Sequence, residues 1–183
     1  MHVQVERIQK RDFDAVFTLL RTSLPDFGEI DAENFRRDFE KNFREHEQDT
    51  HYFVARHEDG RVLGLVGYGR ENLSADTYYL GWFVVDVSVQ RSGIGDTLLQ
   101  RVEKELIQGG RARQLIVREW DQGANDPAAR FYVKNGFEKI AVLPEYWDDW
   151  ADMAIYRKRF KASQKQSAGN RSSLAQNAKP LIS

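Results

Sequence analysis

The sequence predicts a mixed α/β fold built around one hydrophobic core, and two patterns indicate this class. Short segments with alternating or continuous apolar residues, typical of strands, are interspersed with segments whose apolar residues recur every three or four positions, as in amphipathic helices. In the middle of the chain a strand segment, a helical segment and a second strand segment follow one another. That order predicts a right-handed crossover between two parallel strands.

Length and composition agree with one domain of ordinary size. The chain has 183 residues and a formal net charge of −1, which argues against a general nucleic-acid-binding protein. It contains no cysteine, which excludes disulfides, thiolate metal sites and a cysteine nucleophile. We expect one domain over residues 1–160. Residues 161–183 are rich in Ser, Gln, Asn and Lys without an apolar period, so we expect a flexible tail there.

No part of the sequence predicts contact with a membrane. No window approaches the roughly 20 apolar residues of a membrane-spanning helix. The opening residues, MHVQVERIQKRD, lack the apolar stretch of a secretory signal. We therefore expect a cytoplasmic protein.

The N-terminal part is expected to form a strand and two helices. Residues 3–8 alternate like a half-buried strand, and Asp12 opens a helical run that Pro25 to Gly28 interrupts. A second helix over about Ala32–Arg44 places three rings at a spacing of four on one face: Phe35, Phe39 and Phe43. We interpret this stripe as packing against the sheet. The alternative is the lining of a substrate pocket.

Three strands are expected next, at His51–His57, Val62–Arg70 and Tyr78–Val89. In the third, every residue from Trp82 to Val85 is apolar, at odd and even positions alike, which is typical of a strand covered on both faces. It should therefore lie at the centre of the sheet.

The segment VQRSGIG then leads into a helix that ends at Gly109-Gly110, a suitable C-terminal cap. The rest of the domain is expected to form a strand, a helix and two further strands. Their expected bounds are Gln114–Trp120, Asp126–Lys134, Phe137–Leu143 and Ala151–Phe160.

Gly93 and Gly95 lie at the turn from the third strand into this helix. The first amides of a helix lack partners and carry partial positive charge, so such a turn suits a phosphate. The glycines would leave room for an oxygen, while Arg91 and Ser92 would add donors. The alternative is a tight turn without a ligand. A dinucleotide fingerprint would need a third glycine where this chain has Leu98, and the Gly-Lys-Ser/Thr of a Walker loop is absent.

Two segments resemble motifs of the GNAT superfamily of N-acetyltransferases. QRSGIG, from Gln90 to Gly95, resembles the Q/R-x-x-G-x-G/A loop, and NDPAARFYVKNGF, from Asn125 to Phe137, resembles the N-x-x-A-x-x-F-Y-x-x-x-G-F segment. The resemblance implies a mostly antiparallel mixed sheet with a central parallel strand pair and flanking helices. It also implies acetyl-CoA as co-substrate, and it makes a homodimer a possible assembly.

The same resemblance implies which residues hold the cofactor. The pantetheine arm would lie along the backbone of Phe83, Val84 and Val85, in a gap beside the neighbouring parallel strand. The pyrophosphate would lie on Gln90, Arg91, Ser92, Gly93, Ile94 and Gly95. Asn125 would contact the cofactor near its acyl end, or alternatively cap the helix that follows it. We expect no metal site.

Tyr132 resembles the family's general acid, placed beside the leaving sulfur. A phenol has a pKa of about 10 and an alkyl thiol about 8.5, so complete donation of the proton is unfavourable by roughly 2 kcal/mol. We therefore expect Tyr132 to stabilise the thiolate by a hydrogen bond, with the proton moving late. The alternative role is an aromatic anchor beside Phe131.

The sequence leaves the base open. Only about one lysine-like amine in a thousand is neutral at pH 7, so some group must take its proton. Many relatives carry a carboxylate on the fourth strand, where this chain has Gly81 and Trp82. Glu119 and Glu71 are the candidates here, and a water chain could replace either. Asp96, in the first turn of the phosphate-facing helix, should point outward.

Residues 144–152, PEYWDDWAD, combine carboxylates with aromatic rings and suit a cationic amine. The alternative is a solvated connection between the last two strands whose tryptophans cover the sheet edge.

We expect an N-acetyltransferase that acts on a primary amine, most simply of a small molecule. Transfer should be direct in a ternary complex, because no cysteine can carry an acyl group. The alternatives are a protein or peptide N-terminal acetyltransferase and a non-catalytic acyl-CoA-binding module. No nucleic-acid or membrane partner is expected.

Overall fold

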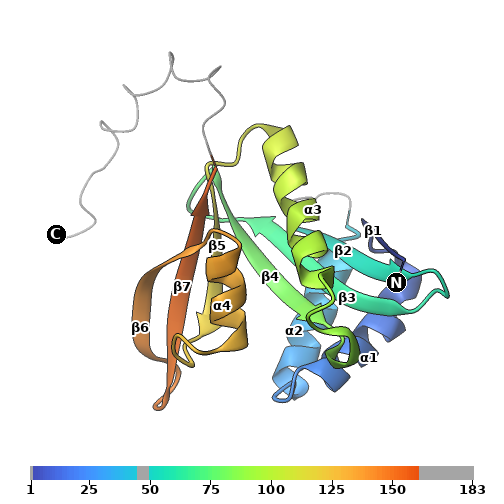
Figure 1. The fold of residues 1–183 in the computed structure, drawn as a ribbon, viewed down its shortest axis with the longest axis horizontal. Helices are drawn as coiled ribbons and strands as arrows, with labels where there is room; N and C mark the ends of the chain where they lie inside the picture. The colour runs from blue at the N-terminus through green and yellow to red at the C-terminus, as the bar shows by residue number, and fades with distance from the viewer. Residues whose placement is uncertain (1, 45–49, 161–183) are drawn as a thin grey trace.

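The computed structural model describes residues 2–44 and 50–160, so the expected tail at 161–183 lies outside the described residues. Within them the strands form one seven-stranded sheet in the order β1-β2-β3-β4-β5-β7-β6 (Figure 1). The strands are β1 (Val3–Arg7), β2 (Thr50–His57), β3 (Val62–Arg70), β4 (Thr77–Val85), β5 (Gln114–Trp120), β6 (Glu138–Asp148) and β7 (Ala151–Arg159). The helices are α1 (Phe13–Ser23), α2 (Glu29–Lys41), α3 (Ile94–Gly109) and α4 (Pro127–Lys134), with short 3-10 turns η1 (Lys10–Asp12) and η2 (Val87–Val89).

β4 lies in the middle of the sheet, as its apolar sequence predicts, and it runs parallel to β5. The other neighbouring strands of this sheet pair antiparallel. The parallel ladder is short: it begins at Thr77 opposite Gln114 and ends at Leu80 opposite Val117. Beyond that point the two strands diverge, which Figure 1 shows as an opening wedge. The expected fold class is confirmed.

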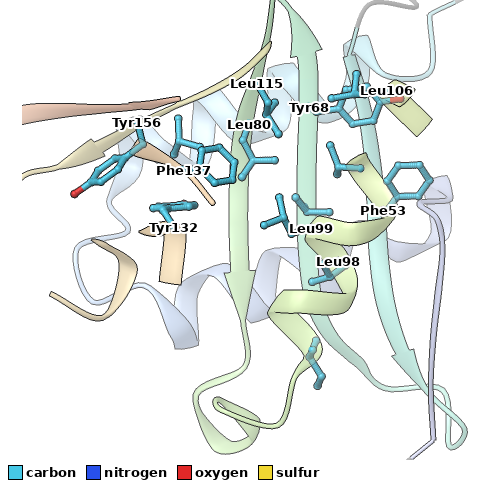
Figure 2. Packing of buried hydrophobic residues seen from close by; sticks show 14 of the residues in the cluster. Phe53, Tyr68, Leu80, Leu98, Leu99, Leu106, Leu115, Tyr132, Phe137 and Tyr156 are labelled. Carbon is cyan, nitrogen blue, oxygen red and sulfur yellow. The ribbon is translucent and has the colours of Figure 1, made fainter. Parts of the chain in front are cut away.

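Helices cover both faces of the sheet because its strands are apolar on both. Along β2, Phe53 belongs to the core beside α3, and the next residue, Val54, belongs to the core beside α1 and α2. On the α3 side, Figure 2 shows Leu98 and Leu99 packed over the sheet, with Tyr132 further along the same cluster. Helices therefore pack on both faces of the sheet around β4.

The phenylalanine stripe of α2 packs against the sheet, as predicted: Phe35 and Phe39 are buried in the core beside α1 and α2. The helix begins at Glu29, three residues before the predicted start. The cause is local, since the amide of Gly28 donates to the Asp31 carboxylate at 3.0 Å and so satisfies the helix N-terminus there.

Two predicted strand ends are wrong. β4 stops at Val85 rather than Val89, because the Asp86 carboxylate accepts hydrogen bonds from the Ser88 amide at 2.8 Å and hydroxyl at 2.6 Å. These bonds turn the chain into η2. β6 continues to Asp148 rather than ending at Leu143, but its pairing with β7 is interrupted between Leu143 and Asp148, and its residues there are exposed.

Candidate functional site

The corner between β4 and α3 has the backbone conformation of a turn that exposes helix amides. Gly93, the N-cap of α3, has φ = 88°, and Arg91 has φ = 63°, a conformation that only glycine adopts without strain. A Cβ added to Gly93 would meet no atom within 4 Å. The Ser92 hydroxyl is committed to the Val89 carbonyl at 2.6 Å. The corner thus presents an open backbone rather than a set of free side chains.

Gly95 leaves room for the neighbouring helix. A Cβ at Gly95 would approach the Phe131 ring to 3.2 Å, so the missing side chain lets α4 lie against the start of α3. Contact of the Gly95 backbone with the cofactor stays a prediction. The Phe131 ring also contacts Phe83 edge-on, with 5.4 Å between centroids. Ile94 is buried in the core, so only its backbone is available to a ligand. Residues of β4, α3 and α4 predicted from separate motifs therefore converge here.

β4 offers a free backbone edge in the wedge beside β5. Val84 and Val85 pair with β3 on one side and lie beyond the last β5 partner on the other. The Val85 carbonyl receives only a long contact of 3.5 Å from the exposed Gln90 side chain. Trp82, just before this edge, has φ = 35°, at a register shift in the ladder with β3. The shift turns the strand and directs the indole of Trp82 into a pocket.

Asn125 is exposed, and it does not cap α4. The N-cap is Asp126, whose carboxylate accepts a hydrogen bond from the Ala129 amide at 2.8 Å. The capping alternative for Asn125 is therefore wrong.

The side chain of Asp96, in the first turn of α3, contacts the end of α4: it accepts hydrogen bonds from Lys134 Nζ and Asn135 Nδ2, each at 3.0 Å. Asn135 and Lys134 lower the pKa of the Asp96 carboxyl.

Tyr132 of α4 is an aromatic anchor in the core beside Phe131, and its role as general acid stays a prediction. Its ring is buried among Phe131, Phe137 and Tyr156, with centroids 5.6 Å from each (Figure 2). Its hydroxyl lies close enough to the carboxylate of Glu119 on β5 for the two groups to shift each other's pKa. Burial raises the pKa of Tyr132 well above that of a free phenol, and the negative charge of Glu119 raises it further. The phenol is therefore held in its protonated form.

Glu119 is the carboxylate best placed to act as a base. Burial raises its pKa, whereas hydrogen bonds from the Trp120 amide and the Tyr132 hydroxyl oppose that rise. Glu71 is engaged elsewhere, since it accepts a hydrogen bond of 2.8 Å from Arg118. Arg118 and Glu119 both line one pocket, although successive residues of a regular strand point to opposite faces. The widening gap between β4 and β5 lets both side chains reach it.

This pocket has a volume of about 750 Å³ and lies between the α1–α2 connection, the diverging strands and the β6–β7 hairpin. Its aromatic lining consists of Phe27, Trp82, Trp120, Trp147 and Trp150. Its charged lining consists of Asp26, Asp31, Arg118, Glu119 and Asp148. The hairpin with its tryptophans thus belongs to the pocket wall. Sequence reasoning missed the contribution of residues 24–31, where Pro25 and Gly28 signalled only the end of a helix.

The described residues contain no cluster of His, Cys, Asp or Glu suited to a metal ion. None of the helices in the described ranges is long and apolar enough to cross a membrane.

A model of the acetyltransferase (GNAT) family matches residues 13–137. Among solved structures, a Desulfovibrio desulfuricans protein assigned to the GNAT family is 25% identical with a TM-score of 0.77, over 86% of this chain and 99% of that one. No curated protein matches the sequence significantly.

Two more distant structures share the fold. The ribosomal-protein-S18-alanine N-acetyltransferase of Escherichia coli is 18% identical with a TM-score of 0.72, over 90% of this chain and 98% of that one. An aminoglycoside 6'-N-acetyltransferase complexed with coenzyme A is also 18% identical, with a TM-score of 0.68 over 85% and 96% of the two chains. At these identities the likeness concerns the fold alone.

Proposed function

The chain belongs to the acetyltransferase (GNAT) family, and on that premise we propose that it transfers the acetyl group of acetyl-CoA to a primary amine of a small molecule. The observation that carries the proposal is the Glu119–Tyr132 pair: Glu119 lines the pocket, on the part of β5 beyond its last β4 partner, and it interacts with the phenol of Tyr132. In the proposal Glu119 accepts the proton of the amine and Tyr132 donates one towards the cofactor.

The described residues fit acetyl-CoA at two places. The free edge of β4 can pair with the amides of an extended arm as a strand would, and we assign that role to the backbone of Phe83, Val84 and Val85. The open corner at Gly93 and the amides of α3 suit a diphosphate. There we assign contacts to Gln90, Arg91, Ser92, Gly93, Ile94 and Gly95, and Asn125 to the acyl end. When bound, the cofactor supplies the acetyl thioester.

We assign Glu119 as the group that takes the proton from the amine. Its raised pKa makes it a stronger base than an ordinary carboxylate, and it lines the pocket. Protonation of Glu119 also removes the negative charge that raises the pKa of Tyr132. The Tyr132 hydroxyl then becomes a better donor towards the departing sulfur. One proton transfer therefore prepares the next.

We assign a small-molecule acceptor to the pocket. It is flanked by Trp147 and Trp150 of the hairpin on one side and by Asp26 and Phe27 of the α1–α2 connection on the other. An extended peptide would need an open groove instead. Because the chain contains no cysteine to carry the acetyl group, transfer is direct in a ternary complex. The cytoplasmic location and the homodimer stay sequence-based predictions.

Release of free thiol tests the proposal. Protein, acetyl-CoA and a panel of primary amines are mixed, and thiol is followed with a chromogenic reagent, to which the cysteine-free chain contributes nothing. The proposal expects release that depends on both the protein and an amine. Tight binding of acetyl-CoA without release for any amine would instead identify a non-catalytic acyl-CoA-binding module.

A further inference from the structure

The acceptor pocket carries negative charge that the described part of the chain does not neutralise. Four carboxylates line it: Asp26, Asp31, Glu119 and Asp148. None of them forms an ion pair with a described residue. The one basic residue in the lining, Arg118, pairs with Glu71 at 2.8 Å. Unpaired acids such as Asp86 and Asp149 also occur elsewhere in the described residues, so the distinctive feature of this pocket is that four of them line one cavity.

Neutral donors hold three of these carboxylates in place without cancelling their charge. Asp148 accepts hydrogen bonds from the Asp149 amide at 2.8 Å and from Trp150 Nε1 at 3.1 Å. Asp31 accepts one from the Gly28 amide, and Glu119 one from the Trp120 amide at 3.3 Å. The acids are therefore fixed and ready to receive a cation.

Two pairs of aromatic rings line the same pocket. On one side Phe27 and Trp82 meet edge-on with centroids 6.1 Å apart, and on the other Trp120 and Trp150 meet at 5.2 Å. All four tryptophans of the chain line the pocket. Trp147 and Trp150, at the hairpin, are 56% and 69% exposed. Ring faces beside carboxylates attract an alkylammonium ion by cation–π and charge attraction together.

We propose that the acceptor is a diamine or polyamine: a primary amine with at least one further positive charge, separated from it by apolar atoms. The inference rests on the proposed function, whose acceptor it specifies. The reacting amine lies at Glu119, the inner acid, and the second cation lies among Asp148, Trp147 and Trp150 at the hairpin.

The negative charge of the pocket favours a substrate with a second cation, for the following chemical reason. Carboxylates stabilise an ammonium ion, so they raise the pKa of a nearby amine and disfavour the neutral form that reacts. Acids that surrounded only the reacting amine would therefore oppose the chemistry. Acids that bind a cation which does not react hold the substrate and leave the other end free to lose its proton to Glu119.

Cadaverine and hexylamine test this directly, since they have equal numbers of heavy atoms and differ by one positive charge. Binding is measured by intrinsic fluorescence, because every tryptophan lies in the pocket lining. We expect cadaverine to bind at least about tenfold more tightly than hexylamine, as one charge-assisted contact provides. The difference should shrink as salt is added.

Two neighbouring variants locate the second cation. Asp148→Asn should remove most of the preference for cadaverine, whereas Asp149→Asn, one residue further along and outside the pocket lining, should keep it. Equal affinity for the two amines, or equal effects of the two variants, overturns the inference. Thiol release with the same amines separates the two proposals. Release without preference in binding removes only the diamine assignment, while preference in binding without release removes only the catalytic function.

Discussion

The buried phenol of Tyr132 on α4 interacts with the carboxylate of Glu119 on β5: burial and then the negative charge of Glu119 raise the pKa of Tyr132. The two residues come from different motifs and from either side of a turn at Gly123, which has φ = 86°. The negative charge of Glu119 helps to keep the phenol protonated, whereas burial, and not the phenol, raises the pKa of the Glu119 carboxyl. In the proposed mechanism the pair passes a proton from the acceptor pocket towards the cofactor.

Replacement of the Tyr132 hydroxyl should affect turnover and not cofactor binding. We expect Tyr132→Phe to lower kcat by about 100-fold or more, the usual contribution of a proton donor, with the Kd for acetyl-CoA nearly unchanged. Tyr156→Phe is the matched control, because Tyr156 packs against Tyr132 in the same cluster at 5.6 Å. Thiol release and calorimetry give the two readouts. Loss of cofactor binding in Tyr132→Phe would make Tyr132 a structural residue.

Because the pKa of Glu119 is raised, replacing this residue by a neutral one should stabilise the folded protein by an amount that depends on pH. Burial raises the pKa in the folded state, so the folded protein is stabilised while Glu119 is protonated, below the ordinary pKa of about 4.3. That stabilisation is lost as pH rises through the folded pKa. Glu119→Gln stays neutral throughout. Its melting temperature should therefore exceed that of the wild type by more at pH 8 than at pH 4. A constant difference across this range would contradict the assignment.

The two glycine caps of α3 allow backbone strain to be separated from ligand binding. Gly93 and Gly110 stand at opposite ends of the helix with φ = 88° and 68°, and a Cβ at either would meet nothing within 4 Å. Replacement by alanine should lower the free energy of unfolding by about 1–2 kcal/mol at each. Only Gly93→Ala should weaken acetyl-CoA binding, as measured by calorimetry. Equal effects of both variants on binding would show that Gly93 acts through stability alone.

Arg91 should show opposite effects on stability and on binding. It holds φ = 63° without being glycine, so Arg91→Gly relieves strain and should raise the free energy of unfolding by up to about 1 kcal/mol. Loss of the guanidinium should weaken acetyl-CoA binding by about tenfold. Arg91→Ala removes the charge but keeps the strain, so it should bind as weakly without the gain in stability. Chemical denaturation and calorimetry measure both quantities.

The sequence predicted those parts of the fold that depend on local patterns. The bounds of β3 and β5 and the glycine cap of α3 agree with the prediction, because alternation and cap chemistry act over a few residues. The end of β4 depended on one side chain, Asp86, turning back on the backbone. The continuation of β6 depended on pairing with β7 across the hairpin. Neither effect produces a periodic pattern of apolar residues in the sequence.

The candidate site was predictable where motifs carry it and not where distant segments meet. The corner at Gly93 and the position of Tyr132 follow from short patterns. The pocket joins the chain near Phe27 to the hairpin near Trp150, more than 100 residues further along. Strand alternation placed Arg118 and Glu119 on opposite faces, but β5 has no β4 partner after Val117, and both residues line the pocket. That geometry depends on the splay and not on the sequence of β5.

Calorimetric titration of the whole chain with acetyl-CoA tests the central claim most directly. The account predicts saturable heat with one site per chain, because the open amides at Gly93 and the free edge of β4 together receive the cofactor. The absence of any binding heat up to millimolar acetyl-CoA would contradict it.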